Sequence, residues 1–78
     1  MIHAEVHNDK LIDQSIWYEE EERMTLIFHD NRVYEYNGIT KEIYEEFVKA
    51  ESQESYFKEN IKTKHNFLKI ENDVVNHE

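Results

Sequence analysis

Alternating apolar and polar positions in the first half of the chain predict β-strands. Residues 24–28 read Met-Thr-Leu-Ile-Phe, which follows the two-residue period of a strand with one buried face. Residues 16–18 and residues 33–36 are rich in β-branched and aromatic side chains, which favour strands on either side of that segment. We therefore expect three consecutive strands in an antiparallel meander.

The loop between the second and third expected strands leaves two registers open. Asp30-Asn31 tolerates the left-handed conformation that tight turns require. A two-residue turn would put Tyr34 and Tyr36 on the face of Ile27. A three-residue loop with a bulge would instead put both tyrosines beside Leu26. We favour the three-residue loop because it gathers the larger apolar set on one face of the sheet.

Beyond Gly38, the only glycine, the pattern changes to that of helices. Thr40 is a suitable N-cap for a helix over residues 41–50, and Ser52 is one for a second helix over residues 53–61. The first helix has a single apolar stripe, formed by Ile43, Tyr44, Phe47 and Val48.

These elements predict an α+β domain in which a three-stranded antiparallel β-meander is followed by two α-helices packed on one face (β-β-β-α-α). We expect the single domain to span residues 10–70, with a flexible lead-in over residues 1–9 and a flexible acidic tail over residues 71–78. The predicted core consists of Ile16, Tyr18, Met24, Leu26, Phe28, Tyr34, Tyr36, Ile39, Ile43, Phe47 and Phe57.

Composition narrows the class of protein further. The 78 residues include 18 acidic and 9 basic side chains, so the formal net charge is −9, and ten aromatic residues argue against disorder of the chain as a whole. Without cysteine the chain forms no disulfide and no thiolate metal site. No apolar run approaches the roughly 20 residues of a membrane span, and the N-terminus lacks a signal-peptide pattern. We therefore expect a cytoplasmic protein with no membrane partner.

The order of these segments resembles the KTSC domain, a family named for its place at the C-terminus of some lysyl-tRNA synthetases and also found as small bacterial and phage proteins. The resemblance covers residues 10–69. It is carried by Ser15-Ile16-Trp17-Tyr18, by Met24-x-Leu26-x-Phe28, by the central Tyr34-Glu35-Tyr36, by Ile39-x-x-Glu42-Ile43-Tyr44, and by Ser52-x-x-x-Tyr56-Phe57-x-x-x-Ile61-Lys62.

The resemblance implies the fold given above, while the family's role is not established. RNA binding has been suggested for the family from its association with the synthetase. This chain has Asn31 and Glu54 at or near positions where the family usually has Gly, and it lacks a Pro near Thr40. The carboxylate at position 54 would alter any surface that other members share.

A basic segment is the first candidate binding surface. Residues 58–70 contain four lysines and one glutamate, a net charge of +3 in an otherwise acidic chain. Lys58, Lys62 and Lys64 with Phe67 are the residues we expect to contact RNA, because phosphate binding needs lysines with little competing carboxylate. The alternative is a solvated segment whose lysines offset nearby acids.

The two motif tyrosines also have two interpretations. Tyr34 and Tyr36 could form a platform on which unpaired bases stack. The favoured hairpin register instead places both rings in the core, under the helices.

A protein partner is the alternative class of function. We expect Trp17, Ile27 and Val33 on the sheet face opposite the helices, where an uncovered apolar surface would bind another chain.

Catalysis is not expected. The sequence contains no nucleophile, base and orienting group at a supporting spacing, and a single glycine excludes a Gly-rich phosphate loop. On a strand, His3, Glu5 and His7 would share a face with a spacing that can hold zinc, but a flexible N-terminus is the favoured interpretation. We therefore expect no enzyme activity, no cofactor and no metal.

Overall fold

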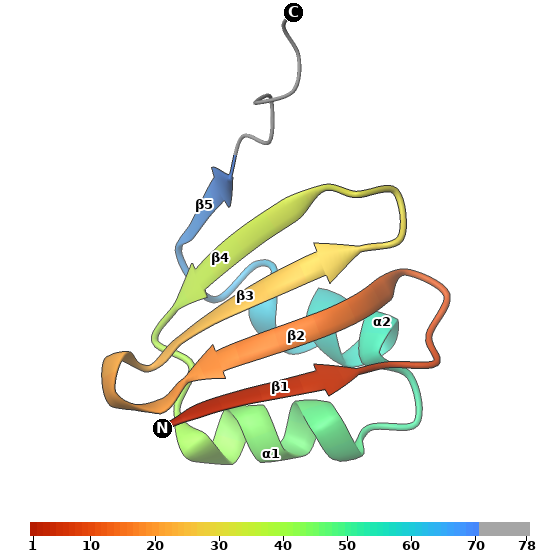
Figure 1. The fold of residues 1–78 in the computed structure, drawn as a ribbon. Helices are drawn as coiled ribbons and strands as arrows, with labels where there is room; N and C mark the ends of the chain where they lie inside the picture. Colours follow the sequence, from red (N-terminus) through yellow and green to blue (C-terminus); the bar gives the residue numbers. More distant parts are fainter. Residues whose placement is uncertain (71–78) are drawn as a thin grey trace, which may run out of the picture.

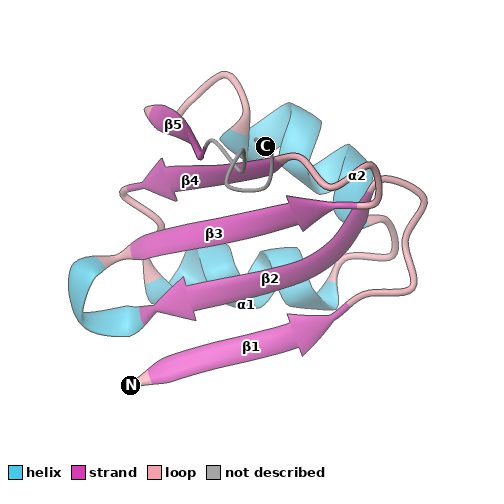
Figure 2. Ribbon diagram, turned by 45° about the horizontal axis from the view of Figure 1, so that its top comes forward, coloured by secondary structure: helices cyan, strands magenta, loops and turns pink. Residues whose placement is uncertain are grey.

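One antiparallel sheet of five strands, with two helices on one face, forms the domain in the computed structural model, which describes residues 1–70 (Figure 1). The elements are β1 (Ile2–Val6), β2 (Ile12–Tyr18), β3 (Arg23–Phe28), β4 (Val33–Asn37), α1 (Lys41–Lys49), α2 (Gln53–Tyr56) and β5 (Phe67–Ile70). The strands lie in the order β1-β2-β3-β4-β5. Figure 2 shows both helices behind the sheet, with the other face uncovered.

The α+β class is confirmed, but the expected three strands are only the middle of the sheet. β1 lies within the segment expected to be a flexible lead-in, and pairs along its whole length with β2. β1 does not show the pattern of a strand with an apolar buried face, because its side toward the helices carries polar residues such as His3. β5 pairs with β4 and forms the other edge of the sheet. The expected acidic tail, residues 71–78, lies outside the described residues.

The hairpin between β3 and β4 adopts the three-residue loop that the apolar pattern favours. The Phe28 N–H donates to the Arg32 carbonyl at 2.9 Å, and Asn31 has a positive φ of 73°. Asn is among the few residues that adopt this left-handed conformation at small cost. Tyr34 consequently lies opposite Leu26 on the helix side of the sheet.

The expected phase of β2 is wrong. Trp17, rather than Ile16 and Tyr18, points to the helices and is only 2% exposed. Its indole N–H donates to the Ile39 carbonyl at 2.8 Å, and its ring stacks on Tyr44 of α1 with centroids 4.6 Å apart. These long-range contacts of Trp17 decide which face of β2 is buried. The apolar character of Ile16 and Tyr18 does not decide it.

A register shift between Ile12 and Gln14 brings Ile12 onto the same inner face as Ser15 and Trp17. The buried apolar core consists of Ile12, Trp17, Met24, Leu26, Phe28, Tyr36, Ile39, Tyr44, Phe47, Phe57 and Ile61. Four expected core residues are only half-buried, namely Ile16, Tyr18, Tyr34 and Ile43.

Both helices begin at the expected caps. The Thr40 hydroxyl accepts from the Ile43 N–H at 3.3 Å, and the Ser52 hydroxyl accepts from the Ser55 N–H at 3.1 Å. α2 continues directly into a π-helical turn over Phe57–Ile61. The wide turn is closed by the Lys62 N–H, which donates to the Phe57 carbonyl at 2.8 Å.

His7, which directly follows β1, packs into the core. The ring is buried, its Nε2 lies 2.8 Å from the Ser15 hydroxyl, and it meets Phe47 of α1 edge-on. Burial lowers the pKa of His7, an effect that outweighs the nearby carboxylates of Glu5, Asp9 and Asp13, which raise it. The folded protein therefore favours neutral His7.

Replacing Phe47 with Ala removes a completely buried ring at the contact between α1 and the sheet. We expect a loss of about 3–5 kcal/mol in the free energy of unfolding, a large share of the stability of so small a domain. Urea denaturation followed by circular dichroism measures it. Ile16→Ala on the uncovered sheet face is the matched control, and equal losses in the two variants would contradict the core assignment.

Stability should also fall on mild acidification through His7. Because its pKa is lowered in the folded state, stability is complete above the ordinary histidine pKa of 6.5 and falls as the pH drops below that value. Urea denaturation at pH 7.5 and pH 5.5 should show a smaller drop for His7→Gln than for the parent chain. An identical drop in both proteins would show that His7 does not carry this dependence.

Candidate functional site

An open cavity of about 450 Å³ lies between the β4–β5 side of the sheet and the π-helical turn. We name it the aromatic cavity. It is lined by Phe28, Tyr34, Tyr36, Phe57 and Phe67, by the cationic side chains of Arg32, Lys58 and Lys62, and by Leu11 and Thr63. Within residues 1–70, no carboxylate lines it.

The five rings of the cavity divide into a buried floor and an accessible rim. Phe28, Tyr36 and Phe57 are 5% exposed or less, and Phe57 meets both other rings edge-on. Tyr34 is half-buried, and Phe67 is 56% exposed. The accessible aromatic surface is therefore supplied mainly by Tyr34 and Phe67, whose centroids are 5.5 Å apart.

Burial raises the pKa of Tyr36, with a smaller contribution from Tyr34. The Tyr36 phenol therefore remains protonated at neutral pH.

Three cations reach the cavity from two parts of the chain. Arg32 comes from the β3–β4 hairpin, where its Nε lies 2.7 Å from Asp30 Oδ2. Lys58 lies in the π-helical turn, with its Nζ 2.8 Å from Glu54 Oε2.

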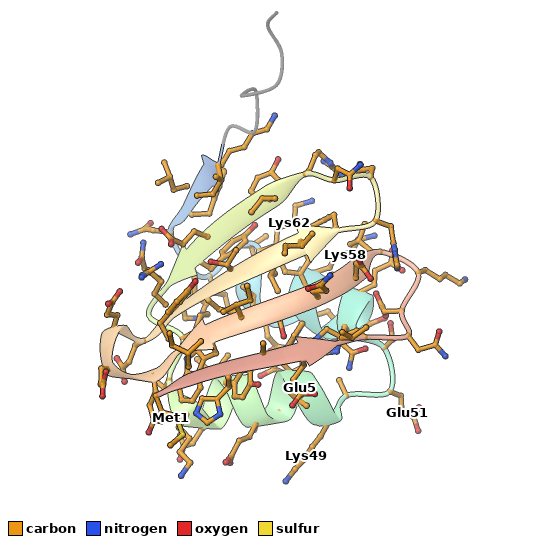
Figure 3. All side chains as sticks on the ribbon, viewed as in Figure 1. Met1, Glu5, Lys49, Glu51, Lys58 and Lys62 are labelled. Atoms are coloured by element: carbon orange, nitrogen blue, oxygen red, sulfur yellow. The ribbon has the colours of Figure 1, made fainter. Side chains whose placement is uncertain are left out.

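Lys62, at the end of the π-helical turn, forms no ion pair with any residue in the range 1–70. Figure 3 shows Lys58 and Lys62 on one side of the molecule, away from Glu5, Lys49 and Glu51.

Most of the residues that the sequence singled out for RNA binding meet in this cavity. Lys58, Lys62 and Phe67 line it together with both motif tyrosines. Lys64 does not line it, and lies exposed in the turn before β5.

Arg32 was missed by the sequence reasoning. A signal for it exists in the sequence, because Arg32 directly precedes β4 and is spaced by two from Tyr34 and Tyr36, so an extended chain points all three side chains to the same side.

The three candidate protein-binding residues lie on opposite faces of the sheet. Trp17 is buried under α1, so it is wrong as part of an exposed surface. Ile27 and Val33 are cross-strand partners on the uncovered face, which we name the outer sheet face. Its larger aliphatic members are Ile2, Val6, Ile16, Ile27, Val33, Leu68 and Ile70.

The histidine pattern of β1 does not form a metal site in the described residues. His3 Nε2 lies 3.2 Å from Glu19 Oε1, whereas His7 faces Ser15 in the interior. No group of three or more His, Cys, Asp or Glu side chains within residues 1–70 is arranged to hold a metal ion.

The helices of the described part of the chain were also compared with the length and hydropathy of a membrane span. None of the helices in residues 1–70 is long and apolar enough to cross a membrane.

Comparison with known proteins identifies a matching family and solved structures of the same fold. The sequence profile of the KTSC domain matches residues 9–67. The crystal structure of a KTSC domain protein from Yersinia pestis superposes with a TM-score of 0.84 at 20% sequence identity, covering 91% of this chain and 100% of that chain. Comparison with curated proteins gave no match. β1 lies outside the family match.

Proposed function

This chain belongs to the KTSC domain family, and we propose that it is a small non-catalytic module that binds single-stranded RNA in the aromatic cavity. The observation that carries the proposal is the convergence of Lys58, Lys62 and Phe67 with the two motif tyrosines around one cavity. Single strands are bound by this combination, in which aromatic rings stack on bases while cations contact the phosphates.

The aromatic part of the proposal rests on Tyr34 and Phe67. Both rings line the cavity, and neither is fully covered by protein. Stacking of a base on such a ring contributes about 1–3 kcal/mol and tolerates any base, because every base has a π-face. The module is therefore expected to bind unpaired bases with little sequence preference.

The electrostatic part rests on Lys62. Its ammonium group forms no ion pair within the described residues, so a phosphate does not have to displace a carboxylate to reach it. Lys58 and Arg32 add positive charge but are each held by a neighbouring acid. The overall charge of −9 disfavours long-range attraction of RNA, so binding depends on contact within the cavity.

Lys62→Glu should weaken binding of a fluorescein-labelled uridine hexamer by about tenfold or more, because it replaces a phosphate contact with a repulsive charge. Fluorescence anisotropy at several salt concentrations measures the affinity. Lys64→Glu is the matched control, since it changes the net charge equally at an exposed position outside the cavity. It should bind nearly as well as the parent chain.

Two results would contradict this function. The first is no binding of the parent chain to the hexamer at low salt. The second is an equal loss of binding in both charge-reversal variants, which would assign the effect to net charge. Circular dichroism spectra of both variants establish that neither change unfolds the domain.

A protein-binding function has one observation in its favour, the outer sheet face. Ile27 and Val33 pair across β3 and β4 on this face, and both helices lie on the other side of the sheet (Figure 2). Such uncovered apolar surface commonly marks a site for another chain.

Ile27→Asp should release a protein that the immobilised parent chain retains from a cell lysate, whereas Lys62→Glu should still retain it. The reason is that the aspartate places a charge in the centre of the apolar surface. Retention by both variants would contradict a partner on this face, and loss with Lys62→Glu alone would favour the cavity instead.

A further inference from the structure

We propose that the aromatic cavity accepts one nucleotide, with a single base against the rim formed by Tyr34 and Phe67 and a single phosphate on Lys62. This inference rests on the proposed function and narrows it. It predicts that a nucleoside monophosphate is sufficient to fill the site, and that an RNA strand contributes one nucleotide to it.

The geometry of the rim limits the site to one base. Tyr34 and Phe67 have centroids 5.5 Å apart and planes tilted by 46°. A base inserted between two rings needs about 3.5–4.0 Å of contact distance on each side, which this pair does not leave. A base can therefore stack on the free face of the rim but cannot be sandwiched within it.

The other rings do not provide a second stacking surface. Phe28, Tyr36 and Phe57 are almost completely covered, because they pack against one another and against the rim. They form an apolar floor for the edge of a base. The aromatic surface that the cavity exposes is thus matched to one ring system.

Pairing of the cations limits the site to one phosphate. Arg32 is engaged with Asp30 and Lys58 with Glu54, so two of the three positive charges at the cavity are already balanced. Lys62 alone supplies an unbalanced charge among the cavity residues described. A phosphodiester carries one negative charge and complements Lys62. A terminal phosphate brings about 1.5–2 negative charges, and a polyphosphate would exceed the charge of the site by still more.

The size of the cavity agrees with these two limits. A volume of about 450 Å³ lies in the lower part of the roughly 300–1,000 Å³ range of small-molecule sites. Thr63 also lines this space and is exposed, so a hydroxyl-bearing side chain is present beside the cavity for a sugar or a base edge. One nucleotide therefore has its apolar, polar and anionic parts matched within a single site.

Titration of the full chain with uridine monophosphate, followed by amide NMR shifts, tests the proposal. Shifts should concentrate on β4, β5 and residues 57–63. Uridine and ribose 5-phosphate should each bind about tenfold or more weakly, because one lacks the phosphate and the other lacks the base. Uridine triphosphate should bind no more tightly than the monophosphate.

Two pairs of variants give matched comparisons. Phe67→Ala should weaken binding of uridine monophosphate by about tenfold, whereas Leu68→Ala should leave it unchanged. Phe67 and Leu68 are 56% and 58% exposed on the same short strand, but Leu68 belongs to the outer sheet face. Lys62→Glu should abolish the dependence on the phosphate, and Lys64→Glu should retain it.

The outcomes separate the two proposals. Binding of the uridine hexamer that depends on Lys62, together with no binding of the monophosphate, would overturn the one-nucleotide site and leave RNA binding standing. A salt dependence steeper than about −0.7 in log K against log salt would do the same, because that slope corresponds to one phosphate on a single strand. Failure of both probes to bind would overturn the RNA-binding function and this inference with it.

Discussion

The register of the β3–β4 hairpin is the constraint on which the rest of the structure depends. The positive φ of Asn31 allows a three-residue loop, and this loop sets Tyr34 opposite Leu26. A slip of one residue would turn every side chain of β4 to the other face of the sheet. The core would then lose Tyr36, and the cavity would lose the Tyr34 ring of its rim. The same local geometry therefore supports both stability and the candidate site.

The helices cover the two halves of the sheet unequally, and the aromatic cavity lies on the less covered half. α1 lies under β1 and β2, where Tyr44 stacks on Trp17 and Phe47 meets His7 (Figure 1). The other half of the sheet is covered by the short α2 and the π-helical turn, of which Phe57 provides the main contact. The π-helical turn is followed directly by Lys62. The ammonium group of Lys62 is therefore placed beside the buried rings of the aromatic cavity.

Distribution of charge matters more for this chain than its sum. The acidic residues gather in the turn before β3, along α1 and at the loops, whereas Lys58 and Lys62 line the cavity. Screening limits the reach of exposed charges to about 8–10 Å at physiological salt. A local site for one phosphate is thus compatible with a net charge of −9, and a long non-specific track for RNA is not. The proposed one-nucleotide site is the form of RNA binding that this balance allows.

Local chemistry determined the parts of the structure that the sequence alone could predict. The two-residue period of β3, the caps Thr40 and Ser52, and the hairpin register depend on neighbours within a few residues, and all three agree with the structure. The motif tyrosines and the basic segment were also visible as candidates. Their meeting in one cavity was not, because β4 and the π-helical turn are brought together only by packing.

Tertiary structure alone decided the phase of β2 and the extent of the sheet. Trp17 is buried because its N–H and ring find partners in Ile39 and Tyr44, more than twenty residues away, and no local pattern encodes that. β1 has a polar inner side and β5 is exposed along its whole length, so neither shows the amphipathic pattern of a core strand. Pairing with β2 and β4 makes them strands. The sequence determined which elements could form, and long-range burial and pairing chose the faces, the edges and the site.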